Sequence, residues 1–179
     1  MSEDRIEVER NIPFPPQEIF SVLCDPEGHV RIDSSGMLMS ATGASVSTVG
    51  DTFVVHMDRE ALNDFPLGEY DVTVEIVKFE QDREIAWKIL GQIRPQIGHV
   101  YGYQLKPVDG GTLVTSYYDW SDIDPVWREA GIFPVISEAA LRATLGILNR
   151  TVARDAARSQ VGGSQVGGSQ VGGPPQLAE

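Results

Sequence analysis

Residues 99–120 read HVYGYQLKPVDGGTLVTSYYDW, and this stretch decides the fold. Apolar and aromatic residues recur at every second position in residues 99–106 and again in residues 112–120, which is the period of a strand with one buried face. The segment PVDGG between them contains an Asp-Gly pair, which favours a tight turn. The sequence therefore predicts two antiparallel strands joined as a hairpin.

Strand patterns also fill most of the chain on the N-terminal side of this hairpin. We expect a first strand at residues 5–12 and further strands at residues 37–42, 51–58, 70–79 and 84–90. No helical pattern separates the strands from residue 37 onward, which excludes a doubly wound parallel fold. The sequence thus predicts an antiparallel sheet of six or seven strands.

Prolines mark two short helices that follow the first strand. Proline is tolerated in the first turn of a helix, so Pro15 or Pro16 is expected to open one of them. Asp25 followed by Pro26 has the order of an N-cap and a first-turn proline, which predicts the second.

A long helix is expected after the last strand. Pro134 marks its predicted start, and the pattern continues to about Arg158. Its apolar residues form two ridges, Ile136, Ala140, Ala143 and Ile147 in one, and Leu141, Leu145, Leu148 and Val152 in the other. So wide an apolar sector must pack against a large surface, and the concave face of the sheet is the available one.

The C-terminal end of the chain has a different composition. Residues 159–173 repeat SQVGG three times, and PPQLAE follows. Glycine and serine dominate these repeats, so they carry too few apolar residues to form a core. We therefore expect one folded domain at residues 1–158 and a flexible tail at residues 159–179.

The charge balance and the N-terminus restrict the partners and the location of the protein. The formal net charge is -12, which disfavours binding to nucleic acid or to an anionic membrane surface. The N-terminal residues resemble no secretory signal, and no apolar run approaches the length of a membrane span. We expect a cytoplasmic protein without membrane insertion. Its single cysteine, Cys24, lies in an apolar pattern and is expected to be a buried, unreactive thiol.

Five segments in the same order resemble one known superfamily. They are NIPFPPQEIF at 11–20, VGDTF at 49–53, REIAW at 83–87, YQLKP at 103–107 and GTLVT at 111–115. Together with the order of strands and helices, they resemble the START-like proteins, and most closely the polyketide cyclase/dehydrase and lipid-transport family of the SRPBCC superfamily. The resemblance covers residues 5 to about 157.

This resemblance implies an α+β fold of the helix-grip type. In that fold an antiparallel curved sheet wraps around a long C-terminal helix, and two short helices follow strand 1. Members of the superfamily include lipid carriers, hormone receptors and aromatase/cyclases, and they share no catalytic motif. The resemblance therefore implies a fold and a cavity, and it does not name an activity.

The candidate lining of such a cavity is rich in aromatic side chains, some with polar tips. The expected ligand-binding residues are Phe53, Val55, Met57, Trp87, His99, Tyr101, Tyr103, Ser116, Tyr118, Trp120, Trp127 and Phe133. A core of purely structural residues would more readily use Leu and Phe, because buried hydroxyl and imidazole groups need hydrogen-bond partners. The alternative, that each aromatic side chain simply fills the core, stays open.

Each of the three histidines has a structural and a functional interpretation. His99 is the candidate general acid or base, although a structural histidine at a strand end fits the pattern as well. His56 and Asp58 share one strand face, which is expected to point to solvent if Phe53, Val55 and Met57 point inward. His29 is expected to be exposed.

Three functions remain open from the sequence. The first is a carrier or sensor that binds a hydrophobic small molecule such as a lipid, a polyketide-like compound or an aromatic metabolite. The second is a cyclase/dehydratase-type enzyme in which His99 and nearby tyrosines move protons. In the third, the tail links the domain to an assembly, and a homodimer is also left open. No nucleotide-binding, hydrolase or metal motif is present, so no cofactor or metal is implied.

Overall fold

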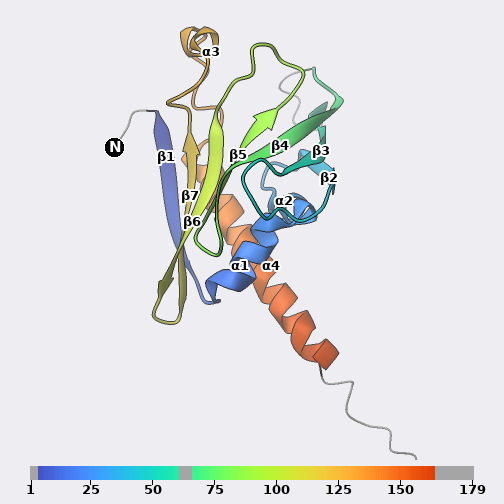
Figure 1. Ribbon diagram of the computed structural model, residues 1–179, viewed down its shortest axis with the longest axis vertical. Helices are drawn as coiled ribbons and strands as arrows, with labels where there is room; N and C mark the ends of the chain where they lie inside the picture. Colours follow the sequence, from blue (N-terminus) through green and yellow to red (C-terminus); the bar gives the residue numbers. More distant parts are fainter. Residues whose placement is uncertain (1–3, 61–65, 164–179) are drawn as a thin grey trace, which may run out of the picture.

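The computed structural model describes residues 4–60 and 66–163 and has one seven-stranded antiparallel sheet with a long C-terminal helix and two short helices packed on one side (Figure 1). The strands are β1 (Arg5–Ile12), β2 (Leu38–Thr42), β3 (Thr52–Asp58), β4 (Glu69–Glu80), β5 (Glu84–Leu90), β6 (Val100–Val108) and β7 (Gly111–Asp119). Their order across the sheet is β1-β7-β6-β5-β4-β3-β2, so each neighbour pair except β1-β7 is adjacent in sequence.

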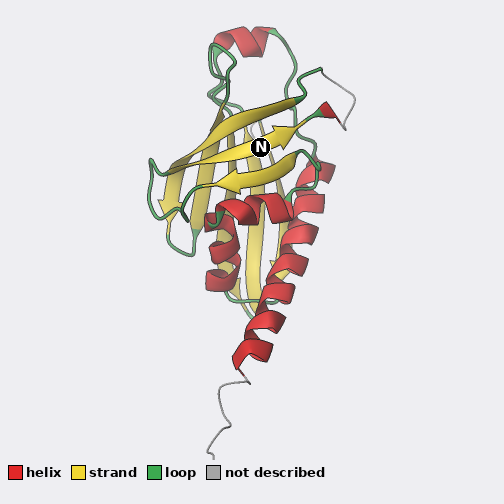
Figure 2. Cartoon of the chain, turned by 90° about the vertical axis from the view of Figure 1, so that its right-hand side faces the viewer, coloured by secondary structure: helices red, strands yellow, loops and turns green. Residues whose placement is uncertain are grey.

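The helices are α1 (Pro16–Cys24), α2 (Pro26–Ile32), α3 (Pro125–Glu129) and α4 (Glu138–Gly163). The first two follow β1 and pack with α4 on the same side of the sheet, whereas α3 lies at the opposite end of the strands (Figure 2). The C-terminal part of α4 extends beyond the sheet (Figure 1). The predicted α+β fold with a curved antiparallel sheet, two short helices after the first strand and a long C-terminal helix is confirmed.

The hairpin that decided the fold forms as its sequence predicts. β6 ends at Val108 and β7 begins at Gly111, so Asp109 and Gly110 make the turn. Gly110 has φ +80°, a left-handed conformation that costs glycine little because it has no Cβ.

Side-chain and proline caps begin the short helices. Pro16 occupies the first turn of α1, and the carboxylate of Asp25 accepts a hydrogen bond from the Glu27 backbone at the start of α2. Asp124 does the same for Val126 at the start of α3. The predicted cap-and-proline pattern is confirmed at Asp25 and Pro26, and the same pattern begins α3.

The long helix begins and ends later than its sequence predicts. It begins at Glu138 rather than at Pro134, and the hydroxyl of Ser137 accepts a hydrogen bond from the Ala140 backbone there. It ends at Gly163 rather than near Arg158, because each added residue of a formed helix gains a backbone hydrogen bond. Residues 164–179 of the predicted tail lie outside the described residues.

Candidate ligand-binding site

The inner face of the sheet, which faces α4, gathers the predicted aromatic residues by strand register. Tyr101 of β6 lies opposite Tyr118 of β7, and Tyr103 lies opposite Ser116. Trp87 of β5 lies opposite Tyr101. Directly opposed residues on antiparallel strands point to the same face, so these side chains form one continuous wall.

Ring contacts extend this wall from β5 to β7. The indole of Trp87 stacks on Tyr101 with centroids 6.5 Å apart and on Tyr103 with centroids 5.9 Å apart. Tyr101 then packs on Tyr118 at 4.8 Å, and Tyr118 packs on Trp120 at 5.3 Å. We call these five residues together with His29, His99 and Phe53 the aromatic cluster.

His99 is buried at the β7 side of the aromatic cluster. Its Nδ1 lies 2.8 Å from the hydroxyl of Tyr118. Burial lowers the pKa of His99 from 6.5 to about 4, so the imidazole is neutral at pH 7. Burial also raises the pKa of Tyr118 above its ordinary value and that of Tyr103 to about 12. The wall thus presents neutral polar groups.

His29 belongs to the aromatic cluster, and the prediction that it is exposed is wrong. Only 6% of its surface is accessible, and its ring lies edge-on to Trp87 at 4.6 Å and to Phe53 at 4.8 Å. The short helix α2 is the cause, because His29 lies on the same helix face as the buried Ile32, and that face packs against the sheet. The spacing of three residues from His29 to Ile32 fits one helix face, but a helix of seven residues is too short for this spacing to show which face is buried.

Strand β3 extends the same inner face toward the other edge of the sheet. Phe53 and Val55 are buried and Met57 is half-buried, all on the inner face. His56 therefore points outward, as predicted, and bonds to Asp71 across the strands at 2.8 Å rather than to Asp58. The carboxylate of Asp58 instead accepts a hydrogen bond from the Glu60 backbone.

The inner face is packed differently at its two ends. Near α1, side chains such as Ile12, Ile85 and Leu148 are sealed from solvent. Toward α3, the inward side chains on the strand ends keep accessible surface, and they are Met57, Tyr70, Ile89 and Tyr101. We call this second end the open end of the inner face.

Two connections cover the open end. Phe133 packs against His99 with ring centroids 6.0 Å apart. The indole of Trp127 donates a hydrogen bond of 3.0 Å to the carbonyl of Pro95. Phe133 therefore joins the aromatic cluster directly, whereas Trp127 ties α3 to the connection between β5 and β6.

Comparison with known proteins gives structural likeness without sequence relatives. No family model matches the chain, and no curated protein matches it. A solved protein from Nitrosomonas europaea is similar, with a TM-score of 0.59 and 15% identity over 88% of this chain and 99% of that chain. An AHSA1-like protein from Aeromonas hydrophila has a TM-score of 0.55 and 19% identity over 85% of this chain and 94% of that chain. A protein from Mesorhizobium loti has a TM-score of 0.56 and 19% identity over 84% of this chain and 97% of that chain.

This chain has the helix-grip fold. At these identities the likeness concerns the fold alone, so the function must be argued from this chain's own residues. No helix in the described part of the chain is long and apolar enough to cross a membrane. Among residues 4–60 and 66–163, no group of three or more His, Cys, Asp or Glu side chains could hold a metal ion.

Two surface hollows of the helix-grip domain lie away from the aromatic cluster. One, of about 340 Å³, is lined by the β4-β5 turn and by residues of β5 and β6. The other, of about 300 Å³, lies between the β1-α1 connection and the β6-β7 turn. Cys24 is half-buried against the core, and burial raises its pKa to about 12, so it stays a thiol.

Proposed function

We propose that this protein binds a hydrophobic small molecule between the inner face of its sheet and α4. The observation that carries the proposal is the aromatic cluster, whose neutral polar tips lie beside the open end of the inner face. Small-molecule sites combine mostly apolar walls with a few placed polar groups, and this face has that composition.

The polar groups of the aromatic cluster, such as the His99 imidazole and the Tyr118 hydroxyl, are costly to bury in a core that only has to be filled. Each buried hydroxyl or imidazole needs a partner, and His99 and Tyr118 meet that need by bonding to each other. Leu and Phe would fill the same volume without that demand. We infer that the polar tips orient a ligand, while apolar contact supplies most of its affinity, at roughly 25 cal/mol per Å² buried.

Exposed apolar side chains surround the open end. Ile93 lies in the connection between β5 and β6, close to Pro95, which accepts the hydrogen bond from Trp127. Val126, Ile132 and Val135 lie on the connection that contains α3. The exposed fractions of these four side chains are 45% to 56%. Exposed apolar groups that gather at one place mark ligand or partner sites. In this proposal the ligand passes this rim, and the half-buried side chains of the open end move apart to admit it.

The resemblance to the SRPBCC superfamily supports the same class of ligand: a lipid, a polyketide-like compound or an aromatic metabolite. The enzymatic alternative requires His99 to move protons near neutral pH. A general base works best when its pKa is close to the working pH, and burial lowers that of His99 to about 4. We therefore propose a carrier or sensor role, in the cytoplasm.

Native mass spectrometry of the purified protein, followed by extraction of any bound compound, tests this proposal. We expect a hydrophobic compound at near-unit stoichiometry, or a rise in melting temperature with members of a panel of apolar compounds. The variant Met57→Trp fills the open end of the inner face and should lower the affinity for such a compound about tenfold, because it occupies ligand volume.

The matched control is Val54→Trp, which places the same side chain on the outer face of the same strand. It should leave ligand affinity unchanged. An empty protein that no compound in the panel stabilises would contradict the proposal. Equal effects of the two tryptophan variants would place the ligand elsewhere.

A further inference from the structure

His29 is held in one protonation and tautomeric state by its contacts. Its Nε2 lies 2.8 Å from the carbonyl oxygen of Leu23. A carbonyl only accepts hydrogen bonds, so Nε2 carries the proton and donates it. Burial lowers the pKa of His29 to about 4, so the ring is neutral at pH 7 and its Nδ1 keeps a free lone pair. Nδ1 is therefore a hydrogen-bond acceptor.

This acceptor has no partner within the described part of the chain. The Leu23 carbonyl is bonded to Nε2, and the contacts of His29 with Trp87 and Phe53 are ring contacts. Yet no fully buried side-chain nitrogen or oxygen lacks a hydrogen-bond partner among the described residues. It follows that Nδ1 keeps some accessible surface, although only 6% of the residue is exposed and the ring lies between α2 and the sheet.

The surroundings of Nδ1 restrict what that group can be. The rings of Phe53 and Trp87 lie against the imidazole in edge-on contacts, so the surroundings of His29 on the sheet side are aromatic and apolar. The charge of Asp25 acts on His29, but the Asp25 carboxylate is itself paired with Arg31 at 3.6 Å. Nδ1 as an acceptor pairs with a hydrogen-bond donor, and an ionised carboxylate or phosphate has no proton to donate to it.

We propose that the bound molecule is a hydroxyl-bearing, predominantly aromatic compound that donates a hydrogen bond to Nδ1 of His29. This inference rests on the proposed function and makes it more specific, because it gives the ligand a hydroxyl and excludes an anionic head. It also assigns to His29 the role of selecting ligands by that hydroxyl.

Isothermal titration calorimetry with two probes of nearly equal size tests the proposal. 2-Naphthol carries the hydroxyl, and 2-methylnaphthalene carries a methyl group in its place. We expect the wild-type protein to bind 2-naphthol about fivefold to tenfold more tightly, which corresponds to one hydrogen bond. In His29→Phe the two probes should bind with about equal affinity, and 2-methylnaphthalene should still bind.

The matched control is His56→Phe, which makes the same substitution at a histidine on the outer face of the sheet. It should retain the preference for 2-naphthol. Equal binding of the two probes by the wild-type protein would overturn this inference and leave the proposed function intact. A preference that survives in His29→Phe, or that disappears in His56→Phe instead, would also overturn it. If the wild-type protein binds neither probe, the inference fails, whereas the proposed function fails only if the protein is empty and no compound in the wider panel stabilises it.

A second measurement needs no substitution, which matters if His29→Phe fails to fold. In the ¹⁵N spectrum of the histidine rings, Nδ1 of His29 is an unprotonated nitrogen whose resonance responds to hydrogen bonding. We expect that resonance to move when 2-naphthol is added and to move far less with 2-methylnaphthalene. An equal response to both probes would contradict the proposal.

Discussion

Tyr117 and Tyr118 are neighbours on β7, lie on opposite faces of the sheet and are both almost fully buried, with 2% and 0% of their surfaces accessible. Each hydroxyl has a close partner, the Glu84 carboxylate for Tyr117 and the His99 imidazole for Tyr118. The two sites nevertheless differ in the side chains that surround the tyrosine: they are charged on the outer face and neutral on the inner face. This difference separates a structural site from a candidate binding site.

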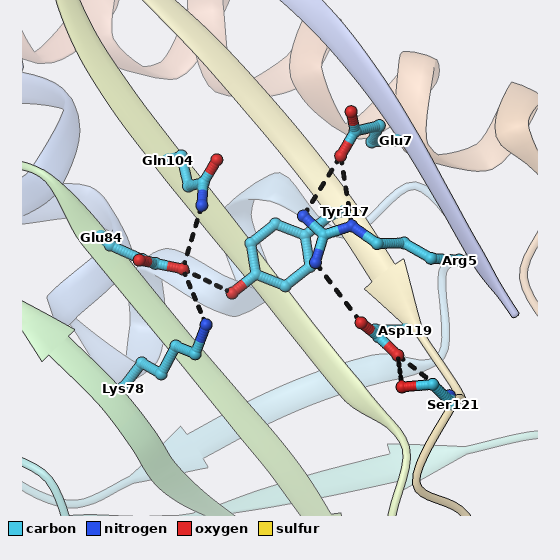
Figure 3. A network of polar contacts seen from close by, with 8 residues as sticks. All are labelled: Arg5, Glu7, Lys78, Glu84, Gln104, Tyr117, Asp119 and Ser121. Atoms are coloured by element: carbon cyan, nitrogen blue, oxygen red, sulfur yellow. Dashed lines mark hydrogen bonds and ion pairs between the residues drawn. The ribbon is translucent and has the colours of Figure 1, made fainter. Parts of the chain in front are cut away.

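Charged side chains complete the outer site (Figure 3). The hydroxyl of Tyr117 donates a hydrogen bond of 2.9 Å to Glu84, and the guanidinium of Arg5 covers the ring 4.0 Å from its centroid. Burial acts to raise the pKa of Glu84, but the hydrogen bonds from Tyr117 and Gln104 together with the hydrogen bond and charge of Lys78 outweigh it and leave that pKa below its ordinary value. Every charged group in this network has a partner on the protein, so the network offers a ligand few unpaired groups to bind.

Neutral side chains complete the inner site. His99 and His29 are both uncharged at pH 7, and each has one ring nitrogen engaged, by Tyr118 and by the Leu23 carbonyl. Neutral groups with spare hydrogen-bonding capacity cost less to bury than charges and suit an apolar ligand with a polar substituent. The comparison teaches that burial of a tyrosine alone does not identify a site, whereas the state of its partners does.

The largest expected effect is a pH dependence of stability that belongs to the inner site. Both histidines have a folded pKa of about 4 against an ordinary 6.5, so their contribution is complete above pH 6.5 and is lost as the pH falls toward 4. Each should contribute about 2–3 kcal/mol to the free energy of unfolding. Urea unfolding from pH 7.5 to 4 should show a shallower fall for His99→Phe than for the wild type.

The control for this experiment lies on the outer face. The hydrogen bond from His56 to Asp71 raises the pKa of His56, so its contribution is present at low pH and is lost as the pH rises. His56→Gln should therefore keep the wild-type fall between pH 6.5 and 4. Identical pH profiles for His99→Phe and the wild type would contradict a neutral, buried His99.

A smaller effect is expected at the outer site, through Gly102. A Cβ added there would lie 2.3 Å from Cζ of Tyr117, so Gly102→Ala must displace the tyrosine from Glu84 and Arg5. We expect the free energy of unfolding to fall by about 2 kcal/mol, measured by urea titration, with ligand binding retained. In the control Gly91→Ala the new methyl group meets Val72 at 3.8 Å, an ordinary contact, and should change stability little. Equal stability of the two variants would mean that Tyr117 is not held in place.

The fold was predictable from the sequence because its signals are local. The alternation in residues 99–120 and the Asp-Gly turn predict the hairpin, and the same alternation places Tyr101 and Tyr118 on one face. His29 was missed because α2 has seven residues, too few for a helical period to show which face is buried. The outer network was missed because it joins Arg5, Glu84 and Tyr117, and only strand order brings such distant residues together.

Aromatic-region NMR of the labelled protein during a titration with 2-naphthol tests the central claim most directly, because the two faces report separately. The account predicts that resonances of Trp87 and Tyr101 on the inner face move in a saturable way, while those of Tyr117 on the outer face stay in place. Movement confined to Tyr117, or no saturable movement at all, would contradict the claim that the inner face binds a hydrophobic small molecule.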